Sequence, residues 1–138
     1  MKFKLQSILY ILILGTFFGC QNDQNIQGNY SVCENGEYTE VYFKKDSMRI
    51  AADNDWVKLS KWRKIEIKND TLYFETFGEW RDSLKAEIKY AGMNTIELRI
   101  LKSGENLNLI HIDENINFEK PKEFWSGFHN RQHLKNCK

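Results

Sequence analysis

The chain has 138 residues, of which 20 are basic and 19 acidic, and 14% are aromatic. A chain of this length predicts one domain with a core of modest size. Its nearly balanced charge argues against a nucleic-acid-binding protein, which needs a basic surface.

The first 19 residues have the pattern of an export signal. Two lysines precede an apolar run of fourteen residues, 5–18, and the small residue Gly19 follows. The run is shorter than the roughly 20 residues that a membrane-spanning helix needs. The pattern predicts a signal peptide, residues 1–19, whose removal leaves 18 basic and 19 acidic side chains, a formal balance of −1.

Cys20 stands at the border between this apolar run and a polar stretch. Phe17-Phe18-Gly19-Cys20 resembles the lipobox of bacterial lipoproteins. The resemblance implies cleavage before Cys20, diacylglycerol on its thiol, and a lipidated tether over 20–27. Several acyl chains anchor a protein durably, because each buried methylene contributes about 0.8 kcal/mol. The resemblance thus implies a protein anchored in a bacterial cell envelope, at the outer membrane; the alternative is a signal that is uncleaved or ordinarily cleaved.

Cys33 and Cys137 are the only other cysteines. Because an exported domain matures in an oxidising compartment, the pair predicts a disulfide. In the chain-entropy model, closing a loop of about 100 residues contributes up to about 4.7 kcal/mol. Two buried thiols are the alternative.

From residue 28 to 118 the apolar residues alternate with polar ones, as in half-buried strands. Short turn segments such as Lys68-Asn69-Asp70-Thr71 separate the runs. The pattern predicts an all-β domain, an antiparallel meander of about eight strands that forms a small barrel or sandwich. The eight runs are 29–33, 40–44, 47–50, 63–68, 71–77, 84–90, 95–101 and 106–112.

The C-terminal segment, 119–138, has a longer period. Pro121 suits a first helical turn, and Phe124 and Phe128 lie four residues apart, which predicts a short amphipathic helix. Gly127 weakens that helix by about 1 kcal/mol relative to Ala. We expect the helix to cover an open edge or end of the barrel.

His129, His133 and Cys137 follow at intervals of four and form one helical stripe opposite Phe128. Imidazole and thiolate suit zinc, but Asn130 stands where a zinc protease carries its general base, so a solvated helix face is the favoured interpretation and no metal or cofactor is expected. A disulfide at Cys137 would require the helix to end before about residue 134. A metal site would require it to continue.

Three residues are candidates for ligand contact. Gly28-Asn29-Tyr30 is similar to the Gly-x-Trp opening of lipocalins, which implies that Tyr30 closes one end of a barrel. Trp56 and Trp62 alternate with lysines and arginine over 56–68. This stretch suits anionic headgroups or an acidic partner, although it also fits the polar face of a strand pair.

Three triplets, Asp46-Ser47-Met48, Asp70-Thr71-Leu72 and Asp82-Ser83-Leu84, resemble O-glycosylation sites of Bacteroidetes-type bacteria. They equally suit a turn that opens a strand.

No catalytic motif is recognisable. The sequence favours a non-enzymatic lipoprotein that binds either a small apolar ligand inside the barrel or a protein partner on its surface. A protective, immunity-type lipoprotein that blocks an incoming enzyme or toxin is the main alternative, and a zinc-dependent enzyme is a third.

Overall fold

The computed structural model describes residues 26–90 and 93–138. The export signal and Cys20 lie outside these residues. The described residues form nine strands and the helix α2, and none of their helices has the length and hydropathy needed to cross a bilayer. The strands are β1 (Gly28–Glu34), β2 (Glu37–Lys44), β3 (Ser47–Ala52), β4 (Arg63–Lys64), β5 (Glu66–Lys68), β6 (Thr71–Glu75), β7 (Ser83–Tyr90), β8 (Thr95–Ile100) and β9 (Asn106–His111), and α2 is Pro121–Lys135.

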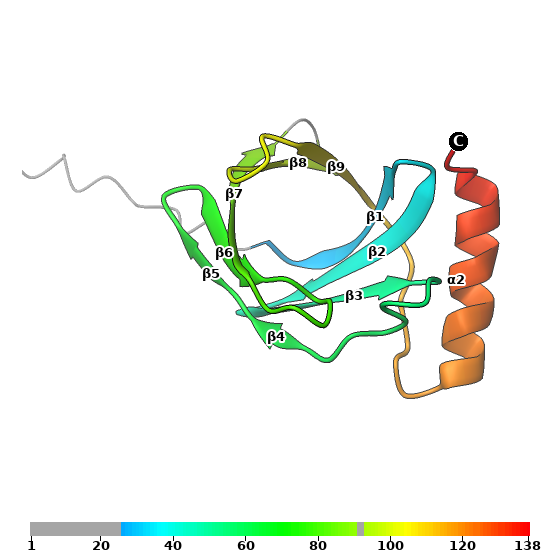
Figure 1. Cartoon of the computed structure of the whole chain (residues 1–138). Helices are drawn as coiled ribbons and strands as arrows, with labels where there is room; N and C mark the ends of the chain where they lie inside the picture. Colours follow the sequence, from blue (N-terminus) through cyan, green and yellow to red (C-terminus); the bar gives the residue numbers. More distant parts are fainter. Residues whose placement is uncertain (1–25, 91–92) are drawn as a thin grey trace, which may run out of the picture.

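All strands belong to one antiparallel sheet with the order β4-β3-β2-β1-β9-β8-β7-β6-β5. The two strands at the ends of this order, β4 and β5, are separated only by Ile65, so the sheet curls into a nearly closed barrel (Figure 1). The predicted all-β fold with a short C-terminal helix is therefore confirmed.

The eight predicted runs correspond to nine strands because the run 63–68 is divided. Its first half pairs with β3 and its second half with β6. Ile65, between the halves, donates its backbone N–H to Asp46 at 2.8 Å and buries its side chain. The alternation continues through Ile65, while the hydrogen-bonding partner changes.

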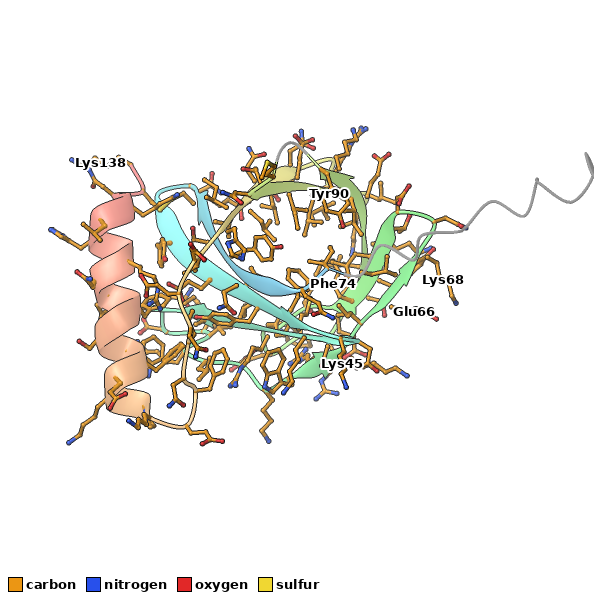
Figure 2. All side chains as sticks on the ribbon, turned by 180° about the vertical axis from the view of Figure 1, so that it is seen from behind. Lys45, Glu66, Lys68, Phe74, Tyr90 and Lys138 are labelled. Atoms are coloured by element: carbon orange, nitrogen blue, oxygen red, sulfur yellow. A yellow bond between two sulfur atoms is a disulfide. The ribbon has the colours of Figure 1, made fainter. Side chains whose placement is uncertain are left out.

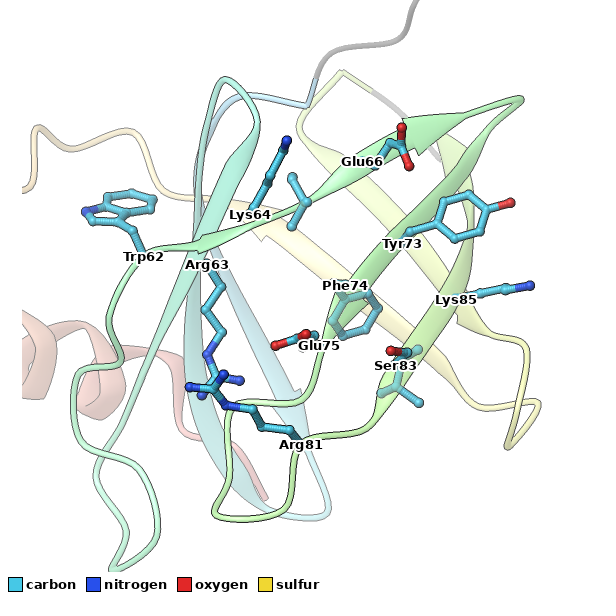
Figure 3. Close-up of a pocket in the computed structure, with 12 residues that line it drawn as sticks. Trp62, Arg63, Lys64, Glu66, Tyr73, Phe74, Glu75, Arg81, Ser83 and Lys85 are labelled. Carbon is cyan, nitrogen blue, oxygen red and sulfur yellow. The ribbon is translucent and has the colours of Figure 1, made fainter.

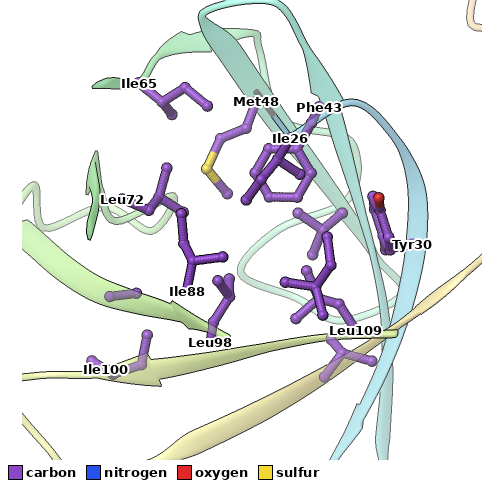
Figure 4. Close-up of a cluster of buried hydrophobic side chains, with 14 residues drawn as sticks. Ile26, Tyr30, Phe43, Met48, Ile65, Leu72, Ile88, Leu98, Ile100 and Leu109 are labelled. Atoms are coloured by element: carbon purple, nitrogen blue, oxygen red, sulfur yellow. The ribbon is translucent and has the colours of Figure 1, made fainter. Parts of the chain in front are cut away.

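The inner face of the barrel is packed with apolar side chains, which we call the interior cluster (Figure 4). Fourteen of its members are buried, and they come from β1–β3, β6–β9, Ile26 and Ile65. Partly buried side chains, among them Phe74 and Phe77, complete the packing, and Figure 2 shows side chains throughout this interior. In β2, for example, Val41 and Phe43 point inward as their spacing predicts.

The helix α2 packs against the outer face of β2 and β3, not over an edge or end of the barrel as expected. Residues on the face of β2 opposite Val41 are buried beneath it, because α2 supplies the apolar partner that this face needs. Five buried residues form this outer cluster: Tyr38, Tyr42, Ala51, Phe124 and Phe128. Figure 1 shows α2 standing beside β1–β3.

Cys33 and Cys137 form the predicted disulfide, with their Cα atoms 5.4 Å apart. The expected helix end before residue 134 is wrong, since α2 continues to Lys135. Asn136 then adopts the left-handed conformation, with φ of 47° and ψ of 62°. This single residue redirects the chain, so Cys137 leaves the solvent-facing stripe and reaches β1 without a break within the helix.

Candidate functional site

A groove lies at the corner where the barrel closes, and we call it the seam groove (Figure 3). The strand pairing ends at Lys64 on the β3 side and at Glu66 on the β6 side. The second half of β6, Phe74 and Glu75, therefore pairs with β7 alone. The groove occupies this corner, with a volume of about 670 Å³, and residues 62–66, 73–75, 81 and 83–85 line it.

The charge of the seam groove is positive. Arg63, Lys64, Arg81 and Lys85 contribute four cationic side chains against the two carboxylates of Glu66 and Glu75, a net of +2. Phe74 and Tyr73 add aromatic surface, and the Lys85 ammonium lies 5.5 Å from the centre of the Tyr73 ring. The groove thus combines positive charge with flat apolar surface, which suits an anionic group attached to an apolar or planar one.

A second, smaller depression adjoins the seam groove, and we call it the loop hollow. It measures about 370 Å³ and lies between residues 56–63 on one side and Phe77 and Arg81 on the other. Arg63 and Arg81 line both depressions. Trp56, on the wall of the hollow, has 78% of its surface exposed, and Trp80, next to Arg81 in the loop 76–82, has 87% exposed. Two indole rings left this exposed are typical of a contact surface.

The structure does not bring the three predicted ligand-contact residues together. Tyr30 is buried in the interior cluster, where its ring packs edge-on against Phe43 and His111 and its hydroxyl donates to the Gln27 carbonyl at 3.0 Å. Trp56 and Trp62 both line the loop hollow. These two tryptophans therefore remain candidates for surface contact, and Tyr30 lies with the packed side chains.

The predicted metal candidates, His129 and His133 with Cys137, do not form a set of three ligands among the described residues. Cys137 is in the disulfide and presents no thiolate. The ring of His129 stacks on Trp125, and its Nε2 lies 3.2 Å from an Asp53 carboxylate oxygen. Within 26–90 and 93–138, no three His, Cys, Asp or Glu side chains are grouped in a way that could hold a metal ion.

Glu40 was missed by the sequence analysis. It is fully buried beneath α2 and accepts hydrogen bonds from the hydroxyls of Tyr38, at 2.6 Å, and Tyr42. The Arg131 guanidinium donates to both Glu40 carboxylate oxygens, at 2.8 and 3.1 Å, and to Glu114 at 2.7 Å. Burial and the Glu40 carboxylate together raise the pKa of both tyrosines. Because its carboxylate, hydroxyl and guanidinium groups bind one another, this network positions α2 on the barrel.

Gly127 of α2 has a role in this network. A Cβ atom at this position would lie 2.9 Å from an Arg131 guanidinium nitrogen. The glycine that weakens the helix therefore leaves the space in which Arg131 reaches Glu40 and Glu114.

A group of three carboxylates lies at the end of β1. Glu34 faces Glu105, in the loop before β9, and Glu37 is close by in the β1–β2 hairpin. The hydrogen bond with Glu105, burial, and the two neighbouring charges raise the pKa of Glu34 to about 7.

The three O-glycosylation-like triplets occupy equivalent places in the fold. Ser47, Thr71 and Ser83 are the first residues of β3, β6 and β7, each directly after a turn or loop. Their positions agree with the turn interpretation, and modification of these residues stays a prediction.

We compared the chain with models of protein families, with curated proteins and with solved structures, and none of them matches it.

Proposed function

We propose that this protein is a non-enzymatic binding module that is anchored to a membrane of the bacterial envelope through Cys20. It docks a protein partner on the surface that carries the exposed side chains of Trp56 and Trp80. The observation that carries the proposal is the exposure of Trp56, on the wall of the loop hollow, and of Trp80, next to Arg81 in sequence, at 78% and 87%. Tryptophan is enriched among the residues that contribute most of the binding energy at protein–protein interfaces.

The packed barrel favours a surface partner over an apolar ligand inside. Fourteen buried side chains fill the interior cluster, and Tyr30 is one of them. A ligand pocket of several hundred cubic ångströms would have to displace this packing, whereas docking on the loops leaves it unchanged.

The proposed anchor agrees with a partner that approaches from the side away from the membrane. The described chain begins at Ile26 beside the end of β9, since Gly28 packs against His111. Trp80 lies at the opposite end, because Asp82 in its loop pairs with Lys102 in the loop that precedes β9. Cys20 precedes Ile26 by six residues, a span of at most about 20 Å. A lipid on Cys20 would therefore hold the Ile26 end near the bilayer and direct Trp80 away from it.

The anchor is tested by Cys20→Ser. We expect this variant to leave the membrane fraction, because Cys20 is the predicted point of attachment. The Cys33→Ser/Cys137→Ser variant is the control, which should stay with the membrane. Sedimentation of the Cys20→Ser protein with membranes would contradict the anchor.

Docking is tested by a photo-crosslinking amino acid placed at Trp80 of the full chain in living cells. We expect a discrete protein adduct that is lost when Trp56→Ala is added. Leu134, which is 75% exposed on α2, gives the matched control site, from which we expect no such adduct. The proposal fails if position 80 gives no adduct, or if position 134 gives the same one.

A further inference from the structure

Arg63 and Arg81 come from different elements of the fold and meet at the border between the seam groove and the loop hollow. Arg63 extends from β4, and Arg81 from the loop before β7. Figure 3 shows their side chains pointing toward each other, and both residues line both depressions. The fold thus brings two guanidinium groups together at one place on the surface.

No carboxylate of the described residues forms an ion pair with either guanidinium. The ion pairs of this region are those of Lys58 with Asp53, Lys68 with Glu66, and Lys102 with Asp82. Arg63 is positioned by a hydrogen bond to the Thr76 carbonyl and lies 5.0 Å from the centre of the Phe77 ring. Both of these contacts leave its positive charge uncompensated. Two like charges held close together repel each other, and an anion bound between them relieves that repulsion.

We propose that the Arg63–Arg81 pair binds carboxylate groups of an acidic, extended segment of the docked partner. This inference rests on the proposed function and names the chemistry of the partner. Guanidinium groups bind carboxylates through two parallel hydrogen bonds, which gives both affinity and orientation. The two depressions continue on either side of the pair, so a segment that runs from one to the other crosses both guanidiniums.

The surroundings favour an acidic protein segment over a membrane. Anionic headgroups would satisfy the same charges, but the chain enters the barrel at the end opposite Trp80. Phe74 in the seam groove and Trp62 at the junction offer apolar surface for side chains beside the carboxylates. A protein segment supplies both kinds of group within a few residues.

Arg81 is the residue to substitute, because Arg63 also donates a hydrogen bond to the Thr76 carbonyl and its loss could disturb the fold there. The full chain in detergent is titrated into a fluorescein-labelled peptide of six glutamates, and binding is followed by fluorescence anisotropy. We expect Arg81→Gln to weaken binding about tenfold or more, since a charge-assisted pair of hydrogen bonds is lost. Arg81→Lys, which keeps the charge but not the fork, should bind with intermediate affinity.

Arg99→Gln is the matched control. Arg99 is exposed on β8, and its substitution removes the same charge at another place, so we expect less than about a twofold change. An equal loss in both variants would overturn the site, because it would show a response to net charge alone. Failure of the wild-type chain to bind the six-glutamate peptide in preference to a six-glutamine peptide would also overturn it.

Two further probes separate the sources of the anion. Inorganic phosphate at millimolar concentration should not displace the peptide, and vesicles with one third phosphatidylglycerol should bind no more weakly to Arg81→Gln than to wild type. Arg81-dependent binding of vesicles in place of peptide would overturn the acidic-segment proposal in favour of lipid. The crosslink through position 80 is independent of these results, so its presence alongside a negative peptide titration would retain partner docking and reject only the acidic preference.

Discussion

The interior cluster and the outer cluster lie on opposite faces of the same strands, β2 and β3, and they differ in chemistry. The interior cluster consists of apolar and aromatic side chains contributed by seven strands together with Ile26 and Ile65. The outer cluster encloses a carboxylate, Glu40, with two tyrosine hydroxyls and a guanidinium directed at it. The side chains on the inner face of β2 and β3 therefore pack against other strands of the barrel, whereas those on the outer face need α2 as their packing partner.

The difference shows what each cluster determines. Apolar packing is tolerant of small displacements, so the interior cluster stabilises the barrel as a whole. A buried carboxylate tolerates almost none, because its cost is offset only when its donors are in place. The helix lacks a side-chain N-cap, and its position depends on Arg131, the two phenylalanines and the disulfide. The outer cluster thus specifies where α2 docks on the barrel.

Removal of the disulfide gives the largest effect that we predict, and it should affect the outer cluster more than the interior cluster. In the Cys33→Ala/Cys137→Ala variant we expect a loss of up to about 4.7 kcal/mol in the free energy of unfolding, because the bond closes a loop of about 100 residues in the unfolded chain. Denaturant unfolding measures the loss. Hydrogen exchange should show faster exchange in α2 than in β7 and β8, and equal acceleration in all three would contradict a helix that is held separately.

Arg131→Met tests whether Glu40 is stabilised only by its partners. This change leaves the buried carboxylate without its guanidinium, and we expect a loss of about 4 kcal/mol in denaturant unfolding. Adding Glu40→Gln should recover part of that loss, since the uncompensated charge is then removed. A single Arg131→Met variant as stable as wild type would show that the network contributes nothing to the docking of α2.

Tyr30→Ala makes the corresponding test in the interior cluster. The ring is buried against Phe43 and His111, so we expect a loss of about 3 kcal/mol from the cavity it leaves. Trp80→Ala is the control and should change the free energy of unfolding by no more than about 0.5 kcal/mol, because that side chain is exposed. A loss below about 1 kcal/mol for Tyr30→Ala would mean that its surroundings collapse around the gap, contrary to a closely packed interior.

The interior cluster could be predicted from the sequence because alternation within each strand is a local signal. Val41 with Phe43, and Ile96 with Leu98, point inward as expected. The outer cluster could not, because Glu40 resembles a solvent-facing carboxylate until Arg131, 91 residues later, is placed beside it. Burial of this kind depends on tertiary packing, and no spacing along β2 signals it.

Of the candidate site, too, the sequence predicted only the part that consists of neighbours along the chain. The sequence pointed to Trp56, Trp62 and the basic stretch around them, since these residues are neighbours in the chain. Arg81 was not predicted, because it meets Arg63 only where the barrel closes. That corner exists because the hydrogen-bonding partner changes at Ile65, while the alternation of side chains continues unchanged.

The smallest effect that we predict concerns Glu34, which lies outside both clusters. Its pKa is raised from 4.5 to about 7, first by the hydrogen bond with Glu105, then by burial and by the charges of Glu105 and Glu37. The folded protein therefore holds a proton between these two pH values that the unfolded chain has released. Stability from this group is complete below about pH 4.5 and decreases as the pH rises through about 7. We expect the melting temperature of wild type to decrease over this interval and that of Glu34→Gln to decrease less, with Glu97→Gln on β8 as the control that keeps the wild-type slope. A slope unchanged by Glu34→Gln would contradict the raised pKa of Glu34.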